Sequence, residues 1–233
     1  MQFIQSKRNR VPSSQSKFTT INSTFLRNLF LYLFTICSVG LHIVNAQTSE
    51  PKWKEIKKKD TWVLYSREKT DSKFVEYKLV GTVNATPNKA SDAALKIMID
   101  SAYLAKGVKR KILKDNGTSA ITYTRVKMPF PLSDRDVVMK VETYQLPNGA
   151  MGVKWQNTTE LAPVPNEKMV RISKAYGFWE FTSAANGTST ATCVMFTDPG
   201  GNVPAAIVNL MAGEALTDDL ANIQKVIALK KSN

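Results

Sequence analysis

The chain has 233 residues, with 32 Lys and Arg against 19 Asp and Glu, one His and two Cys. His42 and Cys37 lie in the first 46 residues, so residues 47–233 contain no His and a single thiol, Cys193. This excludes from that part His-dependent catalytic triads, metal sites built on His or paired Cys, and an internal disulfide.

The first 46 residues have the pattern of a secretory signal peptide. They hold five basic residues and no acidic one, and an almost unbroken apolar run covers residues 29–44. Small or aliphatic residues stand three and one positions before a cut after Ala46, as signal peptidase requires. The alternative is an uncleaved anchor helix, but the run is shorter than the roughly 20 apolar residues that a bilayer core needs.

We therefore predict that residues 1–46 are removed on export and that the protein works in the periplasm or outside the cell. N-terminal sequencing of the protein from its native host should begin at Gln47 or within a few residues of it. A soluble cytosolic form that retains Met1 would contradict export.

Residues 47–233 have the size of one domain and carry clear turn signals. Asn-Gly, the strongest short hairpin signal, occurs at Asn116-Gly117, Asn148-Gly149 and Asn186-Gly187. Hairpins are therefore predicted over 112–127, 136–155 and 176–196. Two earlier strands are predicted at 62–66 and 74–84, and apolar residues alternate with polar ones along the second of these. That alternation indicates a sheet with one buried face and one wet face.

Two segments are predicted to be long helices. The first has Thr86 as its N-cap and Pro87 at its first position, and its apolar spacing runs to Gly107. The second starts at Pro204 and runs to the tail, with Gly213 as a point where it can bend. A long antiparallel sheet curls, and the last helix would fill its concave face. The predicted class is α+β: a helix-grip fold, with a curved antiparallel sheet wrapped around a long C-terminal helix and a hydrophobic cavity between them.

Several motifs are similar to those of one known family. Residues 128–138, MPFPLSDRDVV, resemble the Pro-x-Pro-(Val/Leu)-Ser-x-Arg-Asp-Phe-Val signature of START domains, the steroidogenic-acute-regulatory-related lipid-transfer family, here of bacterial type. Residues 198–204, DPGGNVP, resemble the entry to the last helix of that family. Trp53 and residues 62–65 resemble the opening of the family's domain. Residues 170–172 and 177–179 fall where the family has its Arg-containing strand and the hairpin that follows it. The resemblance covers about residues 52–230 and implies that residues 47–233 are a START-like lipid-binding domain.

The resemblance implies a protein that binds, and in the family transfers, one lipid or other hydrophobic small molecule in an internal tunnel without chemical change. No cofactor or metal is expected, and the protein is expected to be a monomer. Sterol-binding members often carry an Arg in the stretch that here reads Met139-Lys140-Val141, so the ligand class does not carry over. The candidate ligand-binding residues are Met98, Tyr123, Arg135, Met139, Trp155, Arg171, Val203, Ile207 and Met211. The last helix is predicted to be the lid, with Ile207 and Met211 facing inward.

Other interpretations remain for three features. Asp134-Arg135-Asp136 is either a loop-to-strand brace, a source of polarity in the pocket, or a catalytic carboxylate pair. The basic runs at 57–59 and 109–111 are a solvated surface or a landing site for anionic lipid headgroups. They lack the interleaved aromatic residues of a nucleic-acid platform, so no nucleic-acid partner is expected. Cys193 is either a buried apolar filler, which the surrounding strand pattern favours, or a reactive nucleophile, which would have no His in residues 47–233 to activate it.

Two alternative functions stay open from the sequence. One is a helix-grip enzyme acting on a small hydrophobic substrate, and the other is a basic surface-interaction protein with a filled core.

Overall fold

A computed structural model describes residues 51–230. The predicted signal peptide at 1–46 lies outside these residues, so its export and cleavage stay predictions. Within the described part, neither helix is long and apolar enough to cross a membrane.

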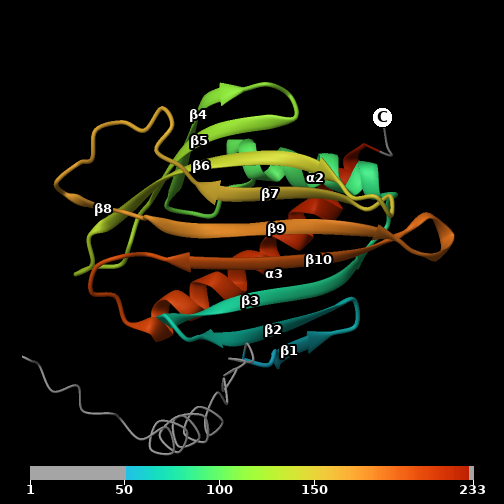
Figure 1. The fold of residues 1–233 in the computed structure, drawn as a ribbon, viewed down its shortest axis with the longest axis horizontal. Coiled ribbons are helices and arrows are strands. Elements are labelled where there is room, and N and C mark those ends of the chain that lie inside the picture. The colour runs from blue at the N-terminus through green and yellow to red at the C-terminus, as the bar shows by residue number, and fades with distance from the viewer. Residues whose placement is uncertain (1–50, 231–233) are drawn as a thin grey trace, which may run out of the picture. The chain divides into compact units, whose positions relative to one another are not determined.

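Ten strands form one sheet in the described part (Figure 1). The strands are β1 (Lys54–Lys59), β2 (Trp62–Lys69), β3 (Ser72–Val83), β4 (Val108–Asp115), β5 (Ser119–Val126), β6 (Asp134–Gln145), β7 (Met151–Asn157), β8 (Met169–Arg171), β9 (Lys174–Ser183) and β10 (Ser189–Asp198). Their order across the sheet is β1-β2-β3-β10-β9-β7-β6-β5-β4, with every neighbour antiparallel. β8 lies off this path and pairs in parallel with the start of β6.

The three predicted hairpins are confirmed as β4–β5, β6–β7 and β9–β10. Each turns at its Asn-Gly pair, and each glycine has a positive φ: 81° at Gly117, 80° at Gly149 and 71° at Gly187. Glycine adopts that conformation without a Cβ penalty, which is why local sequence predicted the turns. β1 and β8 were not predicted. Every residue of β1 is exposed, and β8 has only three residues, so neither carries an apolar alternation.

Two α-helices pack on the sheet: α2 (Pro87–Ile99) and α3 (Ala205–Leu229). Thr86 and Pro87 occupy the predicted first positions of α2. The prediction that this helix reaches Gly107 is wrong, because Asp100 has an extended backbone and caps the following 3-10 turn η1 (Ser101–Tyr103) by accepting from Ala102 N at 2.9 Å. A second 3-10 turn, η2 (Ala185–Gly187), lies between β9 and β10. α3 runs without a break through Gly213.

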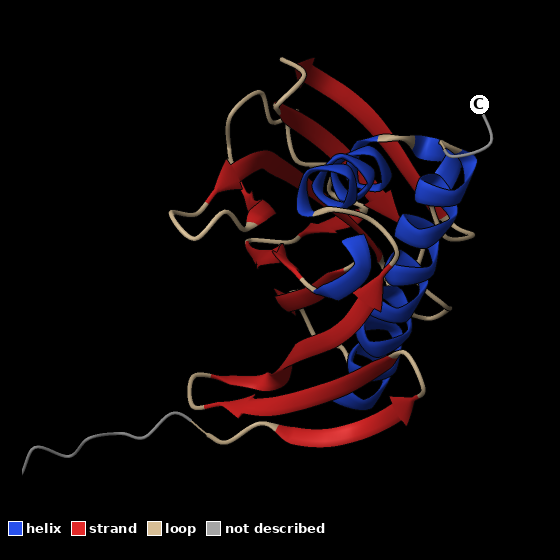
Figure 2. Cartoon of the chain, turned by 90° about the vertical axis from the view of Figure 1, so that its right-hand side faces the viewer, coloured by secondary structure: helices blue, strands red, loops and turns tan. Residues whose placement is uncertain are grey.

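Both α-helices lie on the concave side of the curved sheet (Figure 2). Their buried side chains join those of the strands in one cluster that includes Leu79, Trp179, Phe181, Leu216 and Ile223, each fully buried. This arrangement, a long antiparallel sheet with the C-terminal helix packed on it, confirms the predicted helix-grip fold.

Candidate functional site

The two halves of α3 cover the sheet differently. The C-terminal half buries Leu216, Leu220, Ile223, Val226 and Ile227 against the sheet and α2. The N-terminal half, residues 205–215, has no buried residue. It is held to the sheet where the Tyr77 hydroxyl donates to the Asn209 carbonyl at 2.7 Å. The concave face is therefore packed at one end and more open beneath the first turns of α3.

Several apolar side chains on the concave face are only half-buried. Met139 on β6, Trp155 on β7 and Met195 on β10 belong to this group. Each lies two residues from a fully buried side chain of its own strand, such as Val153 beside Trp155, and therefore faces the same side of the sheet. Their partial exposure indicates looser packing than around Trp179. Methionine adapts easily to a ligand of irregular shape, so this surface has the chemistry of a hydrophobic ligand site.

Trp155 keeps its place because the neighbouring strand has no side chain there. A Cβ at Gly177 on β9 would lie 2.4 Å from Trp155 Cζ2 and 2.6 Å from the Val194 carbonyl oxygen. Such contacts are closer than atoms tolerate, so the indole ring occupies space that only glycine leaves open. Gly177 thus positions the largest side chain of the candidate surface.

The other predicted apolar residues lie in mixed positions. Val203 is fully buried before α3, and Met98 is half-buried on α2 and packed against the core. Ile207 is half-buried, but Met211 is 39% exposed. The inward stripe of α3 instead passes through Ala212, Leu216 and Leu220. The structure thus places Met211 at the outer edge of the helix rather than over the concave face.

Arg135 holds the segment that leads into α3. Its side chain is 3% exposed and donates to the carbonyls of Ser133, of Pro199 (Nε to O, 3.4 Å) and of Gly200 (Nη2 to O, 3.1 Å). Burial lowers the pKa of this guanidinium, and the nearby Asp134 opposes that shift. Arg135 therefore ties the start of β6 to the loop before the helix and is placed as an anchor of that loop.

Tyr123 and Arg171 lie on the opposite, convex face around Asp136. Arg171 donates from Nε to Oδ1 at 2.6 Å and from Nη2 to Oδ2 at 2.8 Å, and the Tyr123 hydroxyl donates to Oδ2 at 2.9 Å. Burial acts to raise the pKa of Asp136, but the hydrogen bonds from Arg171 and Tyr123 outweigh it, so the pKa is lowered. An ionised, fully partnered carboxylate acts as a brace between β6 and β8. Tyr123 and Arg171 are therefore not brought together with Met139 and Trp155.

Sequence reasoning missed two interior charged residues. Asp219 is a half-buried carboxylate on the inward stripe of α3, and burial raises its pKa to about 7 against the opposing charge of Arg110. Arg110 on β4 donates from Nε to Thr124 Oγ1 at 3.1 Å and from Nη1 to the carbonyls of Ile97 (3.3 Å) and Met98 (2.5 Å). The missed signal was spacing, because Asp219 falls within the apolar repeat of the helix.

Cys193 is fully buried on β10, and burial, together with Asp219, raises its pKa well above the usual value for a thiol. A neutral, buried thiol is a poor nucleophile. Residues 51–230 also contain no cluster of His, Cys, Asp and Glu side chains suited to a metal ion.

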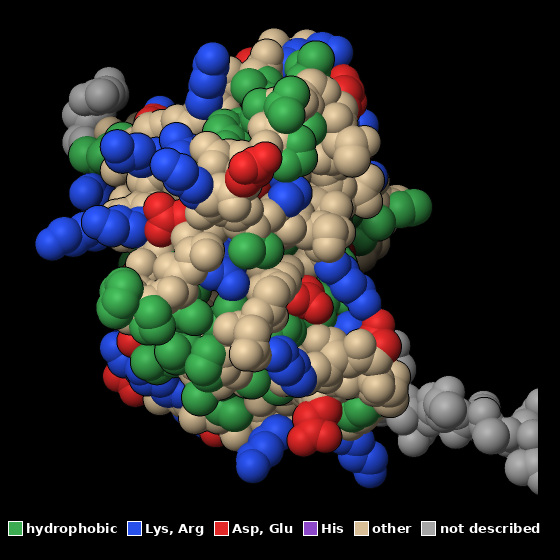
Figure 3. Space-filling view, turned by 90° about the vertical axis from the view of Figure 1, so that its left-hand side faces the viewer, with side chains coloured by type: hydrophobic (Ala, Val, Ile, Leu, Met, Phe, Trp, Pro, Cys, Tyr) green, Lys and Arg blue, Asp and Glu red, His purple; other side chains and the backbone are tan. Residues whose placement is uncertain are grey.

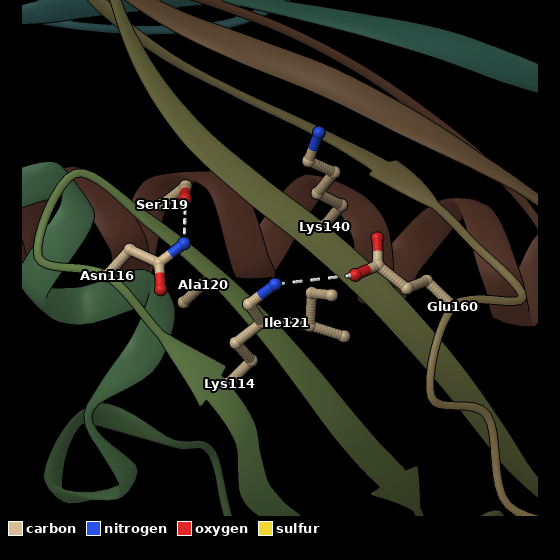
Figure 4. Close-up of a pocket in the computed structure, with 7 residues that line it drawn as sticks. All are labelled: Lys114, Asn116, Ser119, Ala120, Ile121, Lys140 and Glu160. Atoms are coloured by element: carbon tan, nitrogen blue, oxygen red, sulfur yellow. Dashed lines mark hydrogen bonds and ion pairs between the residues drawn. The ribbon is translucent and has the colours of Figure 1, made fainter.

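Hollows at the outer surface have a different character from the concave face. One, of about 200 Å³, lies over β4, β5 and β6 (Figure 4). It is lined by Lys114, Asn116, Ser119, Ala120, Ile121, Lys140 and Glu160. Lys114 Nζ and Glu160 Oε1 approach to 3.8 Å across it. A larger groove of about 600 Å³ lies between α2 and the β4–β5 hairpin and is lined by Leu95, Ile99 and Ile112 together with charged residues. The predicted cavity between sheet and helix stays a prediction.

The two basic runs lie at opposite edges of the sheet, on β1 and β4. Arg110 points inward, while Lys109 and Lys111 are exposed. They therefore do not form one continuous basic surface. The end of the molecule that carries β8 and the start of α3 shows hydrophobic side chains among Lys and Arg (Figure 3). Loops at that end expose Phe130 (97%) and Val164 (89%).

Comparison with known proteins agrees with this architecture. The model of the START domain family matches residues 41–226. An uncharacterised protein of Pseudomonas aeruginosa is 25% identical over 191 residues, covering 82% of this chain and 94% of that protein. Among solved structures, a STAR-related lipid transfer protein fragment from Xanthomonas axonopodis is 23% identical, with a TM-score of 0.63 over 76% of this chain and 98% of the fragment. Human StAR-related lipid transfer protein 5 is 16% identical, with a TM-score of 0.60 over 90% of this chain and 97% of its own. These likenesses confirm the fold.

Proposed function

Because this chain belongs to the START domain family, we propose that it binds one lipid-like hydrophobic molecule between the concave face and the N-terminal half of α3, and releases it unchanged. One observation carries the proposal. Met139, Trp155 and Met195 are half-buried apolar side chains on the concave face, and residues 205–215 of α3, which lie on the same side of the sheet, bury none of their own side chains. Apolar side chains that stay partly exposed on a concave face favour a hydrophobic ligand as their partner.

The binding proposal can be tested by titrating fluorescent fatty acid, phospholipid and sterol probes, with saturation expected at one molecule per chain. Met139→Trp adds volume to the proposed site, so the affinity for the best probe should fall tenfold or more, about 1.4 kcal/mol. The melting temperature should hold or rise, because an open site accepts added volume that a packed core resists. Leu210→Trp, at a position on α3 that is 65% exposed, is the control for the added indole ring and should change neither value.

Two outcomes would contradict the proposal. A folded protein that binds none of the probes would favour the basic protein with a filled core. A probe that is bound and converted would favour the helix-grip enzyme.

The same probes, loaded into donor vesicles, distinguish a protein that transfers its ligand from one that only stores it, because only a carrier moves the probe to acceptor vesicles. If this protein contacts anionic membrane, anionic acceptors should receive ligand faster than neutral ones, and the difference should shrink with salt.

A further inference from the structure

Trp155 leans over the neighbouring strand at the point where that strand has no side chain. On the concave face Trp155 of β7 pairs with Gly177 of β9, and Gly177 pairs in turn with Met195 of β10. A Cβ at Gly177 would lie 2.4 Å from Trp155 Cζ2 and 2.8 Å from Cε2. Side chains on a strand stand roughly perpendicular to the sheet, so these ring atoms occupy the space directly above the Gly177 backbone. The indole therefore reaches across β9 toward Met195.

The Trp155 ring has no aromatic or cationic partner of its own. Within residues 51–230 it makes no ring–ring contact and no cation–π contact, whereas Trp179 stacks on Phe181 with ring centroids 6.0 Å apart. The Trp155 Nε1–H group donates to no residue of this part of the chain, and yet it is not one of its buried unpaired atoms. Part of the indole thus borders open space rather than packed side chains.

The row of residues that contains Trp155 reaches the N-terminal half of α3. Met195 pairs with Tyr77 on β3, and the Tyr77 hydroxyl donates to the Asn209 carbonyl of α3 at 2.7 Å. In the next row of the concave face Trp179 is fully buried, whereas Trp155 and Met195 are half-buried. The boundary between packed core and open apolar surface therefore runs between these two rows, and the Trp155 ring lies on the open side of it.

We propose that Trp155 stacks on a planar, unsaturated ring of the ligand, so that this site prefers flat ring compounds to saturated ones of the same size. Aromatic rings attract each other in offset-stacked and edge-to-face arrangements beyond the effect of the apolar area that they bury. Met195 lies across Gly177, and Met139 is diagonal to Trp155 on the β6–β7 ladder. Their thioethers make favourable contacts with ring edges. The preference rests on the proposed function, because it names the class of molecule held at the same site.

Three alcohols of equal carbon number test this preference: 2-naphthol, decahydro-2-naphthol and 1-decanol, each measured by displacement of a bound fluorescent probe. The unaltered protein should bind 2-naphthol about fivefold more tightly than decahydro-2-naphthol, which has the same skeleton without the flat rings. It should also bind 2-naphthol more tightly than 1-decanol. Trp155→Leu should remove the preference by weakening the binding of 2-naphthol alone, whereas Trp155→Phe keeps a ring and should retain part of it.

Two further variants separate the position of the ring from its presence. Gly177→Ala adds a methyl group that must displace the indole, so the preference for 2-naphthol should fall although Trp155 is still there. Trp53→Leu is the matched control, because that indole already packs against the cations of Arg67 (4.5 Å) and Lys78 (4.8 Å). It should leave all three affinities unchanged.

The unaltered protein decides the matter even where a variant fails to fold. Equal affinities for 2-naphthol and decahydro-2-naphthol would overturn the preference while leaving hydrophobic binding intact. Failure of all three alcohols to displace a bound probe would overturn it too, as would a preference that survives Trp155→Leu. A folded protein to which no fluorescent probe binds at all would instead contradict the proposed function itself.

Discussion

Replacing Asp136 with Asn should lower the free energy of unfolding by about 3 kcal/mol. The Asp136 side chain is 1% exposed and receives two hydrogen bonds from Arg171 and one from Tyr123. The amide of Asn keeps one acceptor oxygen and turns an NH2 group toward the donors of Arg171, so the buried partners lose their pairing. Urea unfolding at pH 7 measures the loss.

Glu142→Gln is the control for this variant. Glu142 pairs with Lys140 (2.9 Å) and Lys154 (3.4 Å) at the surface, where an ion pair contributes only about 0.5 kcal/mol. The lowered pKa of Asp136 sets the pH dependence: its stabilisation is present above the ordinary value of 3.8 and is lost as pH falls through the lower folded value. The difference between wild type and Asp136→Asn should therefore shrink in acid. If Asp136→Asn lowers the free energy of unfolding at pH 7 no more than Glu142→Gln does, the interactions of Asp136 with Arg171 and Tyr123 do not stabilise the fold.

Replacing Arg135 with Met should also cost about 3 kcal/mol and should loosen the start of α3. The Arg135 guanidinium satisfies carbonyls in two loops, at Ser133 and at Pro199 and Gly200. Met fills a similar volume but donates nothing, so these carbonyls are left without a donor. Hydrogen exchange should become faster in residues 205–212 while it is unchanged in the C-terminal half of α3.

Arg125→Met provides the comparison, because Arg125 is exposed and its hydrogen bond goes to the sulfur of Met169 at 3.3 Å. It should cost less than about 0.5 kcal/mol. Equal losses for the two arginines, or unchanged exchange at the start of α3, would show that Arg135 does not anchor the helix entry.

Local signals predicted the elements whose cause is local. Each Asn-Gly pair supplies its own turn geometry, and Pro87 presets the backbone of the first turn of its helix. The same reasoning overran α2, because the apolar spacing continued past Asp100 while the carboxylate of that residue capped a new turn. β8 was missed because three residues carry no pattern, and it is held by its parallel ladder with β6 and by Arg171 on Asp136, 35 residues earlier in the chain.

The sequence by itself determined the fold class, the hairpins, the helix starts and the absence of His chemistry in residues 47–233. Tertiary structure alone decided which candidate residues share a face. Met139 and Trp155 lie on the concave side, Tyr123 and Arg171 lie on the convex side, and Met211 is at an exposed edge. It also brought Arg110 and Asp219, 109 positions apart, within electrostatic reach. Turn and helix signals act over a few residues, whereas burial and charge pairing depend on which distant segments the curled sheet brings together.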